Sequence, residues 1–232
     1  DDDAADTTPA LDRLIGLRRR LGVPLALAVV PATATAALAA RLAGESQIDL
    51  LQHGYAHVNH APPAEKKCEL GTHRPAMMVL GDLGSGWMAM ERLFGARPLK
   101  VLVPPWNRIA PGLVPALPEI GFAGLSVFGP RKRREPVKGL LQINTHVDVI
   151  DWRGARGFVG REAVLGQLVE ALAAARTLSD YHNAEPVGVL SHHLAMDERA
   201  WDFLSLLWDK LIEQGVKTSA AHELFASREA RV

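Results

Sequence analysis

The sequence has little that would tie it to a membrane or to an oxidising compartment. Its one cysteine, Cys68, cannot form an internal disulfide, which fits a reducing compartment without excluding the periplasm. No apolar run approaches the roughly 20 residues that a bilayer-spanning helix needs. No signal peptide is visible, although a removed N-terminal segment would hide one. We therefore expect a cytoplasmic protein without membrane insertion.

Net charge is also lacking. The 26 lysines and arginines balance the 26 aspartates and glutamates, so no overall field favours nucleic acid as a partner. The basic run at residues 131–134 is better explained as a solvated loop. With 232 residues, 48% of them hydrophobic, the chain can bury one substantial core, and we expect a single domain spanning residues 1–232. The oligomeric state is left open.

What the sequence does have is an alternation of strand-like and helix-like segments. Short apolar runs between turn residues predict strands, and amphipathic stretches predict helices. Because strands and helices take turns, the strands should run parallel with helical crossovers, as in an irregular (β/α)7-type barrel. The predicted strands are residues 24–31, 48–52, 99–103, 123–128, 140–150, 187–191 and 216–220, and the predicted helices are residues 8–21, 33–42, 88–94, 112–120, 161–178 and 198–213.

The most informative local feature is His53-Gly54-Tyr55-Ala56-His57, directly after an apolar run. In a helical turn, two histidines four positions apart lie on one face and can direct their ring nitrogens at one metal ion. Neutral imidazole suits zinc and its first-row neighbours. The same spacing occurs by chance on exposed helix faces, so two histidines alone do not establish a metal site.

A third ligand is expected among Asp1-Asp2-Asp3 at the start of the chain. These aspartates stand before a predicted helix, where a strand should end, and in α/β folds the carboxyl ends of strands build the active site. The strand itself is missing from the sequence, so we expect the natural protein to continue before residue 1. Taken alone, three acids would also suit a solvated terminus or a helix cap.

Other polar and aromatic residues follow the remaining predicted strands. In a barrel of parallel strands these ends meet at one mouth, which would gather the residues into one site. Taken singly, Pro-Pro-Trp makes a rigid turn, and a histidine at a strand end is usually a satisfied core residue. The segments in question are residues 1–3, His53, residues 104–107, residues 148–152 and residues 192–193.

In order and spacing, these segments resemble the five motifs of the NodB-homology polysaccharide deacetylases, carbohydrate esterase family 4. The family pattern is a TFDDG-type first motif, then H-[ST]-x-x-H, R-x-P-[YW]-x, D-x-x-D-W and an L-x-x-H-type fifth motif. The resemblance covers nearly the whole chain. The matching segments are Asp2-Asp3-Ala4, His53-Gly54-Tyr55-Ala56-His57, Val103-Pro104-Pro105-Trp106-Asn107, Asp148-Val149-Ile150-Asp151-Trp152 and Val189-Leu190-Ser191-His192.

The resemblance implies a metal-dependent deacetylase on a NodB-like barrel. A divalent cation, expected to be zinc, would be held by Asp3, His53 and His57. Such a cation lowers the pKa of a bound water from about 15.7 toward about 7 and polarises the acetyl carbonyl. The cofactor that the resemblance implies is therefore a single divalent metal ion.

The same resemblance assigns the acid–base residues. Asp2 would be the base that accepts the proton of the attacking water. His192 would protonate the leaving amine, for which it must be an imidazolium. Asp151 beside it would raise the pKa of that imidazole and fix its orientation.

The third and fourth motifs would bind the substrate. By the resemblance, Trp106 and Trp152 would form apolar walls for the face of a sugar ring, and Pro105 and Asn107 would belong to the same surface. The expected activity is removal of an N-acetyl group from an amino sugar or acetylated saccharide, which is also the expected partner. O-acetyl esters and non-sugar amides remain open, since specificity depends on loop shape.

Several positions depart from the family pattern. Val103 replaces the third-motif arginine, which in the family orients the catalytic aspartate, and Arg108 is either a substitute from another direction or a surface residue. Gly54 replaces the serine or threonine of the second motif, so a hydroxyl that could cap or orient the turn is lost. Ala4 stands where glycine is usual.

Two assignments stay open at this level. Three consecutive aspartates allow a one-residue slip in which Asp1 is the base and Asp2 the ligand, although we favour Asp2 and Asp3. His193 directly follows His192, so either histidine could be the general acid.

Two other functions also stay open. Two histidines and a carboxylate form the facial triad of non-haem Fe(II) oxygenases. Those enzymes usually sit on double-stranded β-helices, and the repeated helical segments count against them. The loss of the third-motif arginine would also suit a catalytically weakened carbohydrate-binding barrel.

Overall fold

The strands form a parallel sheet whose order follows the chain. The computed structural model describes residues 1–154, 156–177 and 185–226, and in it five strands pair in the order β1-β2-β3-β4-β5. All of these pairings, and that of β6 with β7 in a second sheet, are parallel. The strands are β1 (Leu25–Val29), β2 (Ile48–His53), β3 (Pro98–Val103), β4 (Gly124–Leu125), β5 (Leu141–Gln142), β6 (Val147–Asp148) and β7 (Val189–Leu190).

The first residues of the chain extend the main sheet beyond β1. Ala4 pairs in parallel with Val29, and the amine of Asp1 donates a hydrogen bond to the carbonyl of Ala26 at 2.9 Å. On its other side, the carboxylate of Asp1 accepts a hydrogen bond from Ser191, which follows β7, at 2.9 Å. Closure of the barrel by strand pairing is not detected among the described residues, so side chains link the two sheets here.

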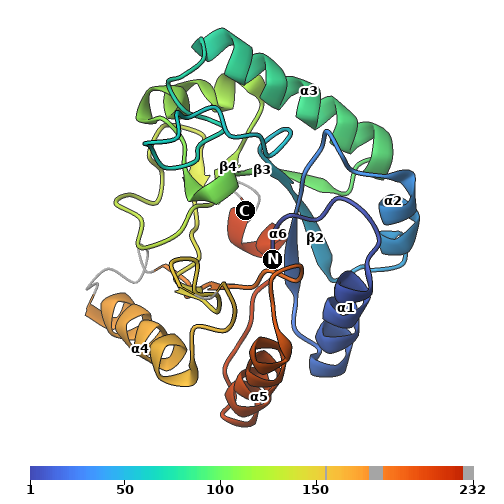
Figure 1. The fold of residues 1–232 in the computed structure, drawn as a ribbon, viewed down its shortest axis with the longest axis vertical. Helices are drawn as coiled ribbons and strands as arrows, with labels where there is room; N and C mark the ends of the chain where they lie inside the picture. Colours follow the sequence, from blue (N-terminus) through green and yellow to red (C-terminus); the bar gives the residue numbers. More distant parts are fainter. Residues whose placement is uncertain (155, 178–184, 227–232) are drawn as a thin grey trace, which may run out of the picture.

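Helices surround the strands. Figure 1 shows α1 to α5 at the periphery and α6 near the centre of the view. Within the described parts of the chain, no helix is both long and apolar enough to cross a membrane. The helices are α1 (Pro9–Leu21), α2 (Ala36–Leu42), α3 (Ala76–Phe94), α4 (Arg161–Thr177), α5 (Glu198–Glu213) and α6 (Ala221–Phe225), with 3-10 helices η1 (Pro105–Asn107), η2 (Pro111–Ala116) and η3 (Pro118–Ile120).

Helix α1 fixes the direction in which the N-terminal aspartates leave the sheet. The hydroxyl of Thr8 accepts a hydrogen bond from the backbone N–H of Leu11 at 3.0 Å, which satisfies one of the unpaired donors at the helix start. Leu11 and Ile15, four positions apart, are fully buried in a cluster with β1 and β2. The cap and this apolar face together hold the segment that follows Asp3.

Helix α6 lies at the opposite end of the main sheet from the aspartates. Asp49, near the start of β2, accepts a hydrogen bond from the backbone N–H of His222 at 2.9 Å. The ring of Phe225 approaches Gly124, the first residue of β4, so closely that a Cβ there would lie 2.6 Å from it. The amino end of the sheet is therefore packed with side chains.

The predicted α/β class and parallel topology are confirmed, but some predicted elements are wrong. Residues 216–220 form no strand, because they are largely exposed and Val216 is their only large apolar side chain. Residues 112–120 form η2 and η3 rather than one α-helix, since Pro115 and Pro118 lack the N–H that an α-helix interior requires. Helix α3 begins well before residue 88, at Ala76.

The predicted strand at residues 140–150 is also divided, into β5 and β6. The chain changes partner between them: Thr145 still pairs with Phe128, whereas the backbone N–H of His146 already donates to the carbonyl of Gly188 at 2.7 Å. This change moves Asp148 from the main sheet to a position beside β7.

Candidate functional site

The carboxyl ends of the strands bring the motif residues together. His53 is the last residue of β2, Val103 ends β3, and Asp148 ends β6. His192 follows β7 by two positions, and Asp2 lies in the N-terminal segment beside β1. Parallel strands present these ends on one edge, as the sequence predicted, and it is here that ligands bind in open α/β sheets.

Asp3, His53 and His57 form a compact cluster of potential metal ligands. Oδ1 of Asp3 lies 3.3 Å from Nε2 of His53 and 3.1 Å from Nε2 of His57. One ligand atom from each of the three residues lies within 4.8 Å of the others. Two imidazoles and one carboxylate are a donor set that zinc and related divalent metals accept.

Two buried atoms of this cluster lack a hydrogen-bond partner. They are Oδ1 of Asp3 and Nε2 of His53, and neither is satisfied by any described residue. Leaving buried polar atoms unpaired costs about 1–3 kcal/mol each. A shared divalent cation would satisfy both atoms, so the residues present fit a metal ion of this kind.

The orientation of His53 is fixed from the third motif. Nδ1 of His53 lies 2.9 Å from the carbonyl oxygen of Val103, so a protonated Nδ1 donates there and leaves the lone pair of Nε2 facing Asp3. The backbone N–H of Gly54 donates to the same carbonyl at 3.1 Å. Although Val103 lacks the side chain of an arginine, its backbone orients one of the ligands.

The surroundings of His57 favour its neutral form. Burial lowers the pKa of His57, and the nearby Asp3 carboxylate only partly opposes this effect. Its ring packs against the ring of Trp106 with the centroids 4.3 Å apart. A neutral imidazole is the form that binds a metal ion.

The backbone around the site is strained. Among the described residues, five non-glycine positions have positive φ, and four of them lie here: Asp3 (62°), His57 (56°), Trp106 (54°) and Asn107 (56°). Left-handed conformations are unfavourable for residues with a Cβ and persist where the surrounding structure enforces them. Such strain is concentrated in functional sites.

Asp2 and His192 form a buried ion pair next to the cluster. Oδ1 of Asp2 lies 2.5 Å from Nδ1 of His192, and the two residues are only 8% and 6% exposed. Nε2 of His192 lies 3.3 Å from the carboxylate of Asp148. The histidine ring therefore bridges two carboxylates.

The pKa values of Asp2 and His192 are shifted from their usual values in opposite directions. Burial alone would lower the pKa of His192, but its hydrogen bonds to Asp148 and Asp2 outweigh burial and raise that pKa to about 9. Burial alone would raise the pKa of Asp2, but the hydrogen bond from His192 and the positive charges nearby, that of His192 first, together outweigh burial and lower that pKa to about 2. At neutral pH the pair is an imidazolium and a carboxylate.

The expected position of Asp151 beside His192 is wrong. Among the described residues, the second carboxylate at His192 is that of Asp148, whereas Oδ1 of Asp151 accepts hydrogen bonds from the backbone N–H groups of Arg153 and Gly154 at 3.1 and 2.9 Å. Asp151 thereby holds the turn that follows β6. Asp148 takes the place at His192 because it ends the strand that pairs with β7.

Two tryptophans flank the cluster and the ion pair. Trp152 meets the ring of His192 edge-on with the centroids 4.8 Å apart, and its indole N–H donates to Asp148 at 2.9 Å. It is 48% exposed and so available to a ligand. Trp106 lies against His57 on the other side.

The turn that carries Trp106 is built by its neighbours. Pro105 is buried and packs so closely on the second motif that a Cβ at Gly54 would lie 2.6 Å from its ring. The backbone N–H of Asn107 donates to the carbonyl of Pro104 at 2.9 Å, which closes the turn. The predicted roles of Pro105 and Asn107 in substrate binding stay predictions.

The structure bears on the register of the three aspartates and on the choice between His192 and His193. Asp1 is turned away from the cluster, and its Oδ1 lies 2.6 Å from Nδ1 of His193. His193 is only 2% exposed, and burial lowers its pKa to about 4. The geometry therefore favours Asp2 and Asp3 over the slipped register, and His192 over His193.

Arg108 points elsewhere. Its guanidinium donates to the carbonyl of Lys67 at 2.7 Å. The hydrogen-bond partner of the Asp2 carboxylate is instead His192. Arg108 therefore does not substitute for the missing third-motif arginine.

Sequence reasoning missed one residue of this region. Glu69 is only 3% exposed, and its carboxylate accepts hydrogen bonds from the backbone N–H groups of Tyr55 and Ala56 at 3.2 and 2.7 Å. It belongs to none of the five motifs. No periodicity or spacing in the sequence marks it.

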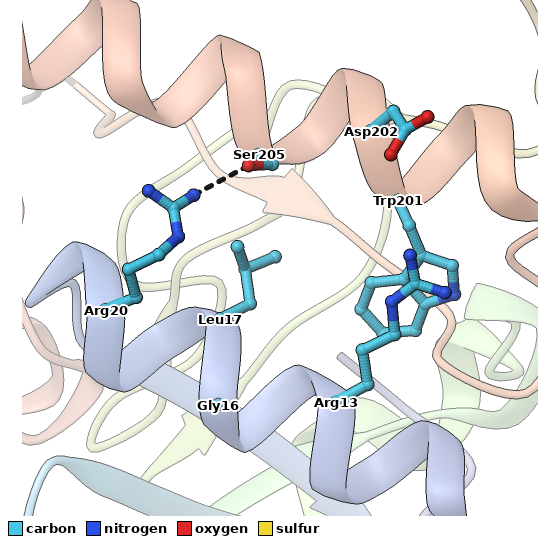
Figure 2. Close-up of a pocket in the computed structure, with 7 residues that line it drawn as sticks. All are labelled: Arg13, Gly16, Leu17, Arg20, Trp201, Asp202 and Ser205. Atoms are coloured by element: carbon cyan, nitrogen blue, oxygen red, sulfur yellow. Dashed lines mark hydrogen bonds between the residues drawn. The ribbon is translucent and has the colours of Figure 1, made fainter.

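A pocket of about 260 Å³ lies elsewhere, between α1 and α5. Figure 2 shows Arg13 over the ring of Trp201 and Arg20 bonded to Ser205. Arg13 also forms an ion pair with Glu198 at 2.6 Å. None of the residues that line this pocket belongs to the five motifs.

Comparisons with known proteins identify the fold. No protein-family model matches the chain, and no curated protein matches it either. Solved structures do match, at 12–16% identity over 90–99% of this chain. At identities this low, the TM-scores of 0.52–0.61 show a shared fold and no more.

Three of these structures illustrate the similarity. A peptidoglycan deacetylase from Bacillus subtilis has a TM-score of 0.60 at 13% identity, covering 99% of this chain and 90% of that one. A family 4 carbohydrate esterase from Streptomyces lividans, in complex with acetate, has a TM-score of 0.58 at 14% identity, covering 94% and 89%. An acetyl xylan esterase of family 4 from Clostridium thermocellum, in complex with a cobalt ion, has a TM-score of 0.56 at 15% identity, covering 97% and 87%. The chain thus has the NodB-like fold of family 4 carbohydrate esterases, which confirms the fold that the sequence resemblance implied.

Proposed function

We propose that this protein is a metal-dependent hydrolase that removes an N-acetyl group from an amino sugar or acetylated saccharide. The observation that carries the proposal is the adjacency of two groups of residues: the ligand cluster of Asp3, His53 and His57, and the Asp2–His192 ion pair. The fold shared with polysaccharide, peptidoglycan and xylan deacetylases supports the same reaction class.

The ligand cluster would hold a divalent cation, and we propose zinc. A divalent cation supplies Lewis-acid polarisation of an acyl carbonyl and makes water easier to deprotonate. The unpaired Oδ1 of Asp3 and Nε2 of His53 support its binding. The choice of zinc rests on the two imidazoles and one carboxylate.

Asp2 and His192 would move the protons. Amide hydrolysis needs a group that accepts the proton of the attacking water and a group that donates a proton to the leaving nitrogen. Asp2 is ionised at neutral pH and would accept the first proton. His192 is held as an imidazolium by Asp148 and Asp2 and would donate the second.

The two tryptophans support a saccharide as the substrate. Sugar rings present apolar C–H faces, which pack well against aromatic side chains. Trp152 is half exposed beside His192, and Trp106 lies beside His57, so the reacting acetyl group would sit between them. An N-acetylated amino sugar suits the imidazolium, because an amine is a poor leaving group without a proton.

The test is acetate release by the purified chain loaded with zinc. We expect release from oligomers of N-acetylglucosamine, and a loss of at least about a hundredfold in Asp2→Asn. Asp12→Asn, which changes an exposed carboxylate paired with Arg41, is the matched control and should retain full activity. Binding of the oligomers without acetate release would contradict the proposal and favour a carbohydrate-binding barrel. Release from acetylated xylan alone would show that the protein hydrolyses O-acetyl esters instead of N-acetyl groups.

A further inference from the structure

We infer that Glu69 is a positioning residue for the second motif, and that glycine at position 54, where the family pattern has serine or threonine, makes room for it. The inference rests on the proposed metal site, because its consequence is the placement of His57. Two observations support it. Glu69 is a buried carboxylate outside the five motifs, and Gly54 stands where the family pattern has serine or threonine.

The contacts of Glu69 span the turn between the two histidines. Its Oε2 accepts a hydrogen bond from the N–H of Tyr55 at 3.2 Å, and its Oε1 accepts one from the N–H of Ala56 at 2.7 Å. With Glu69 only 3% exposed, these are charge-assisted hydrogen bonds shielded from solvent. The carboxylate therefore holds the backbone immediately before His57.

This turn needs an external constraint. Gly54 has φ of 55° and His57 has φ of 56°, so the chain takes a left-handed conformation at both ends of the segment. Gly54 adopts it freely, whereas His57 carries a Cβ and is strained. The pairing of Glu69 with the intervening N–H groups supplies the constraint that keeps His57 near Asp3.

Gly54 and Glu69 are sterically linked. A Cβ on Gly54 would lie 2.1 Å from Oε2 of Glu69, closer than two such atoms can approach. A serine or threonine at position 54 would therefore exclude the carboxylate from its place. In this chain the side chain that orients the turn comes from Glu69, and position 54 must be glycine.

The backbone around Glu69 is itself anchored. The N–H of His60 donates to the carbonyl of Cys68 at 3.0 Å, and the N–H of Ala110 donates to the carbonyl of Leu70 at 2.8 Å. Leu70 is fully buried and pairs with Ile109 in a parallel bridge. Glu69 thus extends from a segment that is fixed to the loops of both the second and third motifs.

The experiment is a zinc and cobalt titration of Glu69→Gln beside the unmodified chain. The glutamine is close in shape but carries no charge and has one acceptor oxygen instead of two. We expect the zinc dissociation constant to rise by about 10–100-fold, as for other residues that orient metal ligands. The visible absorption of the cobalt form should also change, because it reports on coordination geometry, which a merely structural residue would leave unaltered.

Glu65→Gln is the matched control. Glu65 lies in the same segment, loses the same charge on substitution, is 57% exposed and pairs with His73 instead of the second motif. Its zinc affinity and cobalt spectrum should equal those of the unmodified chain. An equal loss of affinity in both variants would overturn the inference, because it would reduce the effect to net charge.

Gly54→Ala is a broader test of the turn, because its Cβ would meet the Pro105 ring as well as the Glu69 carboxylate, and it serves if Glu69→Gln does not fold. Its Cβ would displace the carboxylate, so zinc affinity should again fall. Unchanged affinity and spectrum in Glu69→Gln, or in Gly54→Ala, would overturn the inference while leaving the proposed function intact. Failure of the unmodified chain to bind zinc would overturn the proposed function and the inference with it.

Discussion

Asp2 and His192, 190 positions apart in the chain, are joined by a hydrogen bond of 2.5 Å at the carboxyl edge of the sheet. Asp148 contacts the other nitrogen of the same ring at 3.3 Å. In the family pattern an arginine of the third motif orients the catalytic aspartate. Here Val103 stands at that position, and the Asp2 carboxylate is hydrogen-bonded to His192. The proposed base and the proposed acid are therefore direct partners.

This pairing predicts that substitutions of Asp2 and His192 are not additive. We expect Asp2→Asn and His192→Gln each to lower kcat by about a hundredfold or more. The double variant should lose little beyond the worse single variant, because each substitution already removes the shared contact. Acetate release under saturating substrate measures all three; multiplicative losses would show that the residues act independently.

The pKa of His192 predicts how stability depends on pH. Its folded-state pKa is raised to about 9, above the unfolded value of about 6.5. The imidazolium therefore stabilises the folded state fully below about pH 6.5, and this contribution is lost as the pH rises through about 9. Urea denaturation between pH 6 and 10 should show a decline for the unmodified chain.

His192→Gln is the comparison for that measurement. It should be less stable at pH 6 and should show a shallower decline toward pH 10, since the titrating group is gone. An identical pH dependence in both proteins would mean that His192 does not titrate in this range.

The ligand cluster predicts that zinc stabilises the folded chain. A ligand that binds only the folded state adds about 2.7 kcal/mol at a concentration one hundred times its Kd. We expect zinc to raise the Tm and a chelator to reverse the increase. The double variant His53→Ala, His57→Ala should show no zinc-dependent increase, and stoichiometric zinc in that variant would rule out these ligands.

Substitutions of the two carboxylates of the fourth motif, Asp148 and Asp151, should have different effects on the pH dependence of activity. Asp148→Asn removes an interaction that raises the pKa of His192, so the alkaline limb of the activity profile should move to lower pH. Asp151→Asn should leave that limb in place, because Asp151 bonds to the turn at Arg153 and Gly154. A shift in Asp151→Asn alone would restore the assignment made from the sequence.

Much of the fold could be predicted from the sequence, because apolar periodicity reports directly on which elements bury a face. The runs that became β1, β2 and β3 were each bounded by turn residues, and α5 showed a clear apolar stripe. Residues 216–220 looked similar on composition but had no face to bury. The predicted boundaries of elements are wrong where prolines interrupt a helix, at residues 112–120, and where the chain changes its strand partner, at residues 140–150.

The site could be predicted only in part. The sequence predicts that Asp3, His53 and His57 come together, with the two histidines on one helical turn. They do lie together, but His53 ends β2 and residues 54–57 form no helix. The choice between Asp148 and Asp151 depends on the turn after β6, which spacing does not encode. Glu69 acts from an irregular segment 14 positions after Tyr55, and only the folded backbone shows that they meet.

The distribution of the site along the chain has a consequence for synthesis on the ribosome. All three proposed ligands are contained in the first 57 residues, whereas His192 is added after most of the chain has been made. The ligand set is nevertheless positioned by later segments, because Val103 orients His53 and Trp106 packs against His57. The proposed cation site therefore depends on β3 and η1, which are synthesised after all three ligands.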